Sequence, residues 1–461
     1  MKRLASFVLF LLAAPALLVA QSTFGSILGT VTDSSGAVIP NAKVTITNLA
    51  ENTSITLQTD AQGNYEAPNL KAGVYQVVIE AAGFKTFQAA KVELAARQVV
   101  RVNATLEVGA VTESIMVQAV APVITTDTQT ITASLDTRRV LELPVNFRGA
   151  GSTSPYRLLA FLPGVQSDDG FNLSVQGAIP AQSEFTLDGI STVSLTGHSP
   201  LPEIYPSAEG IAEMKVQGVG GNAEFGQLGD VTTTSRGGSN EFHGSLFEYL
   251  QNRALDATPF GATSKPPKVA NTFGGSLGGR LIRNRTFFFT AFEEMQYRRS
   301  AVLQATVPTT AMRAGDFSRE SYTVRDPFTG QPLPGNKIPA SQIGNVARKV
   351  FEFYPEPNFG PTDVQRSANF RKNEAAPITS SQFDVRLDHV LTSKQSLFGR
   401  LSYKNISSTS PNWALLPADT SYTHARNFVL SHNYTISPRL LNEFRFGFTI
   451  NDGATKYHFD G

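Results

Sequence analysis

From Glu241 onward, the sequence alternates apolar and polar residues over long stretches. In Ser381–His389, for example, the apolar residues Phe383, Val385 and Leu387 fall on one face of an extended strand and polar residues fall on the other. Seven such stretches are expected to be strands: Glu241–Gln251, Thr272–Leu281, Thr286–Arg298, Ser381–His389, Ser396–Asn405, Arg426–Ile436 and Leu440–Ile450. Two-faced strands of about 9–11 residues are typical of membrane barrels, whereas strands of soluble sandwiches average about five or six. We therefore predict that residues 238–461 form part of an antiparallel outer-membrane β-barrel.

The region from residue 21 to 108 has shorter alternating stretches, separated by turn residues at regular spacing. Its strand candidates are Ser26–Thr32, Lys43–Asn48, Ser54–Thr59, Val74–Glu80 and Gln98–Glu107. Gly36, Gly63, Gly73 and Gly83 fall in the intervening turns, where we expect a positive φ. Short strands of period two with Gly/Asp turns predict a β-sandwich.

Residues 121–237 mix helical and extended signals. Thr137–Val145 predicts a short helix that runs into an extended segment, and Leu158–Val165 predicts a second helix stopped by Pro163-Gly164. Strand candidates are Leu173–Gly177, Glu184–Asp188, Ile211–Gln217 and Asp230–Thr234. Helices alternating with short strands indicate a compact α+β unit.

The N-terminus has the pattern of a secretory signal. Lys2 and Arg3 precede an apolar run, Leu4–Ala20, which ends in a small residue before Gln21. We predict a cleaved signal peptide at residues 1–20. A membrane anchor is the alternative, but about 20 apolar residues are needed to span a bilayer and Pro15 interrupts a shorter run. Later stretches are less apolar still, so membrane residence would require a barrel.

Composition narrows the class of protein further. Charged residues make up 17% of the chain and the net charge is +1, against roughly 25% charged residues in typical soluble domains. There are 31 Phe and 12 Tyr residues, which suits strands that face lipid. The absence of cysteine excludes disulfides, thiolate catalysis and Cys-based zinc sites.

Motifs for enzymatic chemistry are weak in this sequence. The six histidines stand outside any H-E-x-x-H or H-x-x-E pattern, so no metal site is expected. Gly274–Gly278 fits G-x-S-x-G with Ser276 as the nucleophile, and a secreted hydrolase is therefore an alternative, but its flanks predict a strand on both sides. Gly218–Ala223 mimics a dinucleotide loop without a surrounding βαβ unit. We expect no catalytic residue, no cofactor and no nucleic-acid partner.

The sandwich region carries an ordered set of motifs. They are Gly29-x-Val31-x-Asp33, Gly36, Pro40-x-Ala42-x-Val44, Thr59-Asp60-x-x-Gly63-x-Tyr65, Leu70-x-x-Gly73-x-Tyr75 and Gly83-Phe84. This set resembles the carboxypeptidase regulatory-like domain, which implies a prealbumin-like, seven-stranded sandwich without peptidase activity. Two roles stay open for it by analogy: a carbohydrate-binding module or a folded spacer.

A second set of motifs follows in the α+β region. These are Glu142-Leu143-Pro144, Leu162-Pro163-Gly164-Val165, Phe185-x-Leu187-Asp188-Gly189, Ala223-Glu224-Phe225-Gly226 and Asn240-Glu241-Phe242-His243-Gly244. In this order and spacing they resemble the plug domains of TonB-dependent receptors, especially the Oar-like group. The resemblance implies a plug domain at residues 121–237 with Leu187, Asp188 and Gly189 as its plug motif. Asn146–Gly149 departs from the Gly-Arg-Asn stretch usual in that group, which bears on the subgroup and leaves the class unchanged.

Residues 109–120 link the sandwich to the plug. Within them, Glu113, Ser114, Ile115, Met116 and Val117 resemble a TonB box. Such a box leaves its own domain and pairs, as an added strand, with a TonB-like energy-coupling protein in the periplasm. The alternative is an ordinary last strand of the sandwich.

Together, the resemblances imply a mainly β protein of the cell outer membrane: a receptor and transporter that admits an extracellular ligand when the plug rearranges. A Pro/Gly-rich insertion at about 301–373 is the expected extracellular loop. The ligand is not named by the sequence, and an oligosaccharide is the candidate. The alternative function is a surface carbohydrate-binding or adhesion protein without transport.

The number of strands bears on how much of the barrel is present. Closed bacterial barrels use an even number of strands, about 8 or more, and a plug of this size needs a barrel of roughly 22 strands. The sequence ends at Lys456–Gly461 instead of on a strand with a terminal aromatic residue. We therefore expect an incomplete barrel, the front portion of a longer one.

Overall fold

The structure is a computed structural model. It describes residues 22–109, 114–117, 132–143, 155–167, 172–179, 182–195, 200–218, 229–258, 265, 267–360, 368–412, 418–437 and 440–457. The predicted signal peptide at residues 1–20 and Glu113 of the predicted box lie outside these ranges.

The N-terminal domain is a sandwich of two sheets. One sheet has the order β4–β1–β7, with β8 also paired to β1, and comprises β1 (Gly25–Asp33), β4 (Asn64–Leu70), β7 (Val99–Arg101) and β8 (Ala104–Leu106). The other has the order β3–β2–β5–β6–β9 and comprises β2 (Lys43–Asn48), β3 (Thr53–Gln58), β5 (Gly73–Glu80), β6 (Thr86–Leu94) and β9 (Ser114–Val117). Alternate residues face inward, so Val44, Ile46, Val77 and Ile79 are buried in the core. The predicted β-sandwich is confirmed.

Most of the sandwich turns use glycine as the sequence predicted. Gly36, Gly63 and Gly83 have a positive φ, whereas Gly73 does not, because it is the first residue of strand β5. At Gly63 a Cβ atom would also lie 2.8 Å from the carbonyl oxygen of Val31. Close backbone approach and left-handed geometry therefore both require glycine at this turn.

The plug domain, meaning the described residues from 132 to 235, is built on a sheet of order β10–β15–β16–β13–β14. Its strands are β10 (Thr132–Asp136), β13 (Ser183–Leu187), β14 (Ile190–Ser191), β15 (Ile211–Gln217) and β16 (Gly229–Ser235), and a small pair, β11 (Val165–Gln166) and β12 (Ser174–Val175), lies beside them. Helix α2 (Thr137–Glu142) begins where the Asp136 carboxylate accepts a hydrogen bond from the Arg139 amide at 2.8 Å. Two short 3-10 turns, η4 (Pro202–Ile204) and η5 (Ala208–Gly210), precede β15. The predicted α+β unit is confirmed.

The second helix predicted in the plug, over Leu158–Val165, is wrong in type and bounds. The structure has a 3-10 helix, η2 (Pro155–Phe161), and places Val165 in strand β11. Gly164 has φ +79° between them. An apolar run this short cannot offset the cost of nucleating an α-helix, so tertiary packing decides its form. Tyr156 of η2 is fully buried, with its ring 5.6 Å from that of Phe185 and 5.5 Å from that of Tyr205.

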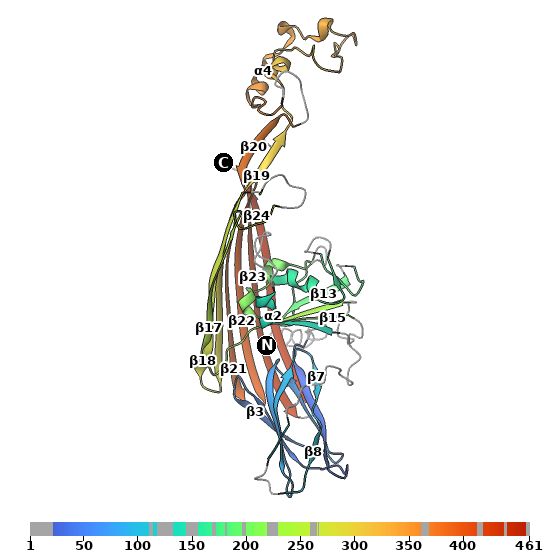
Figure 1. The fold of residues 1–461 in the computed structure, drawn as a ribbon, viewed down its shortest axis with the longest axis vertical. Helices are drawn as coiled ribbons and strands as arrows, with labels where there is room; N and C mark the ends of the chain where they lie inside the picture. The colour runs from blue at the N-terminus through green and yellow to red at the C-terminus, as the bar shows by residue number, and fades with distance from the viewer. Residues whose placement is uncertain are drawn as a thin grey trace, which may run out of the picture.

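The second half of the chain forms one large antiparallel sheet of order β17–β18–β19–β21–β22–β23–β24. Its strands are β17 (His243–Asn252), β18 (Lys268–Ile282), β19 (Thr286–Ala305), β21 (Ile378–Thr392), β22 (Gln395–Ser410), β23 (Asp419–Ser437) and β24 (Leu440–Lys456). All seven predicted strands are present, and most are longer than predicted. In the described part of the chain, β17 and β24 are the two end strands, so the curved sheet is not closed (Figure 1).

The two faces of this sheet differ as the alternation predicted. On β21, Phe383 and Leu387 are 45% and 49% exposed, whereas Gln382, Asp384 and Asp388 are at most 3% exposed. The polar side chains are buried because they face the plug domain, which lies against the concave side of the sheet in Figure 1. The apolar side chains form the outer face, as in a barrel that faces lipid.

The long insertion is shorter than predicted. An eighth strand, β20 (Phe370–Ala375), pairs with the far end of β19 from Ser300 to Ala305. Both ends of the predicted insertion, 301–305 and 370–373, therefore belong to paired strands. The sequence prediction failed because this strand pair carries mixed residues beside a Pro/Gly-rich stretch, with no clean two-residue period.

Residues 306–360 form a small lobe at the end of the β19–β20 extension, at the top of Figure 1 and far from the sandwich. It contains α3 (Thr310–Arg313), η6 (Pro334–Asn336), η7 (Ala340–Gln342) and α4 (Asn345–Glu352). Val307 at its base is fully buried, whereas Phe328 and Phe353 are 95% and 82% exposed. We call residues 306–360 the outer lobe.

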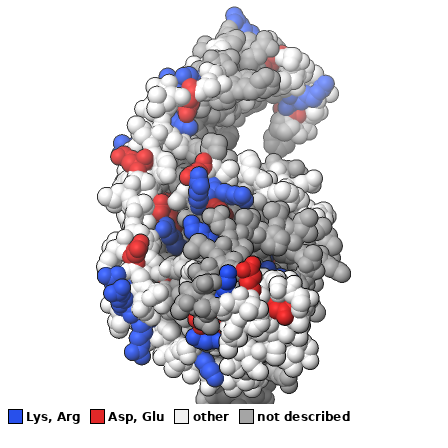
Figure 2. Space-filling model, turned by 60° about the horizontal axis from the view of Figure 1, so that its bottom comes forward, with Lys and Arg blue, Asp and Glu red and all other residues white. Residues whose placement is uncertain are grey.

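Within the ranges that the structure describes, no helix has both the length and the apolarity needed to cross a membrane. Charged side chains of both signs are interspersed on the face seen in Figure 2, with uncharged surface between them. This distribution agrees with the net charge of +1.

Candidate functional site

The predicted plug motif forms a tight hairpin turn. Leu187 ends β13 and pairs with Ile190 of β14, and the turn residues Asp188 and Gly189 have φ values of +50° and +77°. Positive φ at both positions is the geometry that Asp-Gly favours in two-residue hairpins. Leu187 is fully buried, and the turn holds the Asp188 carboxylate toward the barrel wall. All three predicted residues are brought together here.

Asp188 is held by groups from both the plug and the barrel. Its carboxylate accepts hydrogen bonds from the Ser235 amide at 2.9 Å and the Ser235 hydroxyl at 2.8 Å. Arg400 of β22 donates from Nε at 2.5 Å, and Arg386 of β21 lies 3.6 Å away. Burial alone would raise the pKa of Asp188, but the two guanidinium groups and the Ser235 hydrogen bonds lower it below its ordinary value.

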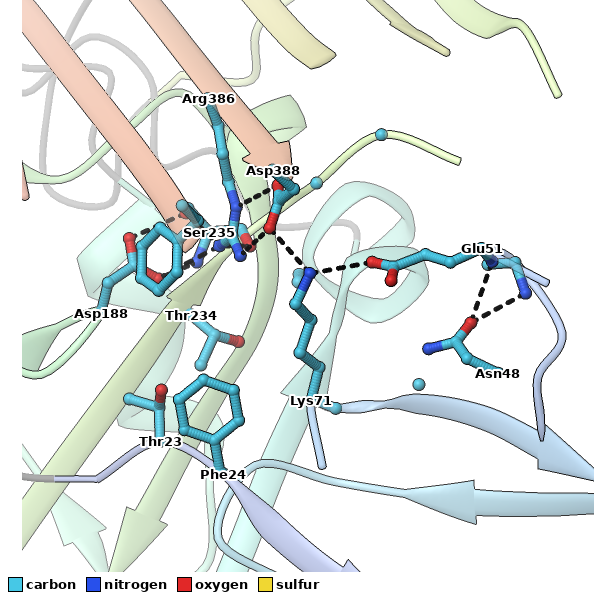
Figure 3. A pocket seen from close by; sticks show the side chains of 17 residues that line it. Thr23, Phe24, Asn48, Glu51, Lys71, Asp188, Thr234, Ser235, Arg386 and Asp388 are labelled. Carbon is cyan, nitrogen blue, oxygen red and sulfur yellow. Dashed lines mark hydrogen bonds and ion pairs between the residues drawn. The ribbon is translucent and has the colours of Figure 1, made fainter. Parts of the chain in front are cut away.

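Further ion pairs connect the plug, by way of residues of the barrel sheet, to the sandwich. Arg386 grips Asp388 with two hydrogen bonds, each of 2.9 Å. The Lys71 ammonium group of the sandwich lies 2.9 Å from Asp388 and 3.0 Å from Glu51. Figure 3 shows Lys71 reaching between these two carboxylates. We call the six residues Glu51, Lys71, Asp388, Arg386, Asp188 and Arg400 the ionic chain.

The ionic chain alternates in sign and joins three parts of the molecule. Glu51 and Lys71 belong to the sandwich, Asp188 to the plug, and the other three residues to the barrel sheet. All of its members except Arg400 line a cavity of about 180 Å³, together with Thr23, Phe24, Asn48, Thr234, Ser235 and Phe398. Burial alone would lower the pKa of Lys71, but Asp388 and Glu51 raise it above its ordinary value. Lys71 is therefore held as a cation.

The ionic chain fixes the relative positions of the sandwich, the plug and the barrel sheet more than it adds to their stability. Its members are mostly buried; the Arg400 side chain is 1% exposed and that of Asp188 2%. Burying charges costs desolvation energy that a good ion pair only roughly offsets, but removing one partner leaves an uncompensated buried charge. The ionic chain therefore favours one arrangement of sandwich, plug and barrel.

The predicted box residues from Ser114 to Val117 form strand β9. This strand pairs in parallel with β6, from Thr86 opposite Ser114 to Ala89 opposite Val117, at the edge of the sandwich sheet. That position matches the alternative of an ordinary last strand. Use of the segment as a box stays a prediction, because a box must leave its domain to act. A short parallel strand at an edge is weakly attached, so detachment is a modest step.

The hydrolase alternative is wrong. Ser276 lies within β18, which continues to Ile282 without the helix that a nucleophile elbow requires. Its hydroxyl lies 2.9 Å from that of Ser245 and donates to Glu209 of the plug at 3.1 Å. Ser276 is thus one more polar contact between barrel and plug.

Sequence reasoning did not single out the other members of the ionic chain. Arg386 and Asp388 were assigned only to the polar face of a strand, and Lys71 only to a turn. Any barrel strand presents polar residues to its lumen, so the pattern carries no mark of which of them pair. A charged residue in the otherwise apolar and glycine-containing turn Leu70–Gly73 is the one signal that could have pointed to Lys71.

Comparisons with known proteins agree with this architecture. The outer membrane beta barrel domain family matches residues 234–460, and the carboxypeptidase regulatory-like domain family matches residues 26–107. The TonB-dependent transporter Oar of Myxococcus xanthus is 29% identical over 338 residues, which cover 69% of this chain and 30% of that protein. The chain thus spans less than a third of the length of this curated relative.

Two solved structures match part of this chain at low sequence identity. The outer membrane transporter YddB from Escherichia coli gives a TM-score of 0.44 at 13% identity, over 71% of this chain and 40% of that chain. The siderophore receptor PirA from Acinetobacter baumannii gives a TM-score of 0.42 at 13% identity, over 70% of this chain and 43% of that chain.

The two family matches and the curated transporter are consistent with one assignment of the chain. It is a protein of the cell outer membrane, a homologue of the TonB-dependent transporter Oar in which a carboxypeptidase regulatory-like domain precedes an outer-membrane β-barrel domain.

Proposed function

We propose that the chain acts as an outer-membrane receptor and transporter of the TonB-dependent type. In this scheme a ligand binds on the outer side, a periplasmic TonB-like protein pulls on the box at Glu113–Val117, and the plug rearranges to open a path. The observation that carries the proposal is the contact between plug and barrel, in which Asp188 of the plug is held at the inner barrel wall by Arg386 and Arg400.

The contacts between plug and barrel suit a part that must move. The apolar core of the plug, as far as the described residues show, consists of plug residues alone. Its contacts with the barrel include polar ones, such as the Ser207 amide donating to Asp384 at 3.0 Å and Gln382 donating to the Tyr205 carbonyl at 3.0 Å. Water can replace such hydrogen bonds when they break, so the plug can shift without losing its own fold.

The lengths of the connections orient the chain in the membrane. The turns at the sandwich end are short, at Arg283–Arg285 and Ser393–Lys394, whereas the outer lobe lies at the opposite end. Outer-membrane barrels have short periplasmic turns and long extracellular loops. The sandwich is therefore assigned to the periplasm and the outer lobe to the cell surface.

An oligosaccharide is the proposed ligand class, and the outer lobe is its proposed first contact. The lobe exposes the aromatic side chains of Tyr322, Phe328 and Phe353, which combine an apolar face with low conformational cost on binding. The same aromatic residues favour the second candidate function, a surface carbohydrate-binding or adhesion protein without transport. A role of the sandwich in binding sugar outside the cell does not suit its periplasmic position.

The test is to change Ile115 to proline in the full-length protein and to measure uptake and surface binding of a panel of labelled oligosaccharides. Proline removes a backbone donor and resists strand pairing, so a box would lose its partner. We expect uptake to fall to the level of cells without the TonB-like protein, while surface binding persists. Proline at Ala119, outside the box, is the control and should leave uptake unchanged. Uptake that survives Ile115→Pro would refute TonB-dependent transport through this box, whereas surface binding without uptake in the unchanged protein would favour the adhesion function.

A further inference from the structure

The sandwich is not tethered loosely below the barrel but docks on it through three turns. The turn after β2 contacts the start of the barrel sheet, where the Asn240 amide donates to the Ala50 carbonyl at 2.9 Å. Asn240 also donates to Asn284, at 2.9 Å, in the short turn between β18 and β19. The turn after β4 supplies Lys71 to Asp388. The sandwich therefore touches the barrel sheet at two of its turns.

The third turn, between β6 and β7, contacts the plug. The Ala96 amide donates to Glu213 at 2.7 Å, and Lys215 donates to the Ala96 carbonyl at 2.7 Å. Arg97 pairs with Asp230 and donates to Thr232 at 2.9 Å. One turn of the sandwich thus binds plug strands β15 and β16 through both its backbone and its side chains.

We propose that the sandwich is a latch that holds the plug inside the barrel, and that Lys71 closes this latch. The inference rests on the proposed function, because it names the domain whose contacts must break before the plug can move. It assigns the domain a role beyond that of a spacer or a sugar-binding module.

The electrostatic reason lies in the sharing of Arg386. With Lys71 in place, the charge of Asp388 is divided between Lys71 and Arg386. This leaves Arg386 free to act on Asp188 and on Ser235, to whose carbonyl it donates at 2.9 Å. When the sandwich leaves, Asp388 has Arg386 as its remaining cation, and the hold of Arg386 on the plug weakens. Loss of the contacts of Arg97 loosens the plug from a second side.

The latch also lies next to the predicted box. Strand β9 pairs with β6, and β6 leads directly into the turn Ala95–Gln98 that grips the plug. A partner that draws β9 away therefore acts on the same domain edge that holds β15 and β16. Release of the latch and displacement of the plug follow from one pull.

The docking can be measured by spin labelling of the full-length protein in outer-membrane vesicles. The chain has no cysteine, so Gln62→Cys in an exposed sandwich turn and Arg283→Cys in an exposed barrel turn place two labels cleanly. We expect one narrow distance distribution in this background. Lys71→Gln should broaden it, raising the undocked population about tenfold or more, which corresponds to a loss of only ~1.4 kcal/mol of docking energy.

Matched variants separate the latch from general damage. Lys43→Gln removes a sandwich lysine that forms an exposed pair with Glu80, and it should leave the distribution narrow. Lys71→Arg keeps the cation and should largely restore docking. Arg97→Gln should undock the sandwich independently of Lys71. Lys71→Gln combined with Asp388→Asn should be no worse than Asp388→Asn alone, because Lys71 acts through Asp388.

Plug retention provides the second readout and needs neither ligand nor energy-coupling protein. Vesicle leakage of a small polar dye should rise in Lys71→Gln and Arg97→Gln and stay at the background level in Lys43→Gln. The latch is overturned if the distances stay narrow in both Lys71→Gln and Arg97→Gln, or if undocking leaves leakage unchanged. Failure of the uptake test with Ile115→Pro would leave these results standing and would instead refute the proposed function.

Discussion

Changing Asp188 to asparagine is expected to free the plug from the barrel wall, at a cost of about 3–5 kcal/mol in plug retention. The side chains of Asp188 and Arg400 are 2% and 1% exposed, so the substitution leaves a buried guanidinium group without its carboxylate. Arg386 retains Asp388, but Arg400 keeps only the neutral partners Ser402 and Asn427. Hydrogen exchange of strands β13 and β16 in the membrane-inserted protein should rise strongly.

The control for this change lies in the same domain. Glu142 pairs with Arg138 on helix α2, with side chains 63% and 81% exposed, and such surface pairs contribute about 0–1 kcal/mol. Glu142→Gln should therefore leave hydrogen exchange in the plug nearly unchanged. Equal exchange in Asp188→Asn and Glu142→Gln would show that the ionic chain does not hold the plug.

The same carboxylate gives a pH dependence of known sign. The pKa of Asp188 is lowered in the folded protein, because Arg400 and Arg386 outweigh the effect of burial. A lowered pKa adds stability above the unfolded value of about 3.9, and this stability is lost as the pH falls through the folded value. The folded and unfolded pKa values of Asp188 both lie below about 5, so plug retention through Asp188 should persist between about pH 5 and 8. It should weaken only in stronger acid. Asp188→Asn should abolish this component.

Changing Phe383 to arginine is expected to destabilise the membrane-inserted barrel by about 2–4 kcal/mol. Phe383 is 45% exposed on the outer face near the middle of β21. If this face meets lipid, arginine must carry its charge into hydrocarbon. If the face met water, the same change would be nearly neutral. Urea unfolding of the protein in lipid vesicles measures the difference.

Two comparisons make the result specific to lipid. Phe328 in the outer lobe is 95% exposed, and Phe328→Arg should shift stability by less than about 0.5 kcal/mol because it stays in water. Phe383→Leu keeps an apolar side chain at the lipid-facing position and should be tolerated. If Phe383→Arg and Phe328→Arg behaved alike, the outer face of the sheet would not be a membrane surface.

The elements with a strong repeating pattern could be predicted from the sequence. All seven barrel strands and the inward and outward faces of β21 follow from a period of two residues, because one face must meet a different environment from the other. Glycine turns such as Gly63 follow from backbone geometry. The Asp188-Gly189 hairpin was missed, because Asp188 was assigned to the end of a strand, although that dipeptide favours positive φ.

What the sequence could not predict depends on contacts between distant segments. Lys71 and Asp388 are 317 positions apart, and neither carries a local pattern that marks it as half of a pair. The 3-10 helix at Pro155–Phe161 is set by packing of Tyr156 in the plug core instead of by helix propensity. Strand β20 forms because β19 extends past the barrel sheet and provides an edge for pairing. The residues of β20 alone do not indicate this pairing.

Energy-coupled transport requires that the box leave the sandwich and reach a partner. The most direct measurement is site-specific photo-crosslinking from a benzoylphenylalanine introduced at Ile115 in living cells that carry a tagged TonB-like protein. The account predicts a crosslinked species that contains this protein and disappears when it is deleted. Crosslinks that form only within the chain's own sandwich under every condition, with β9 always beside β6, would contradict it.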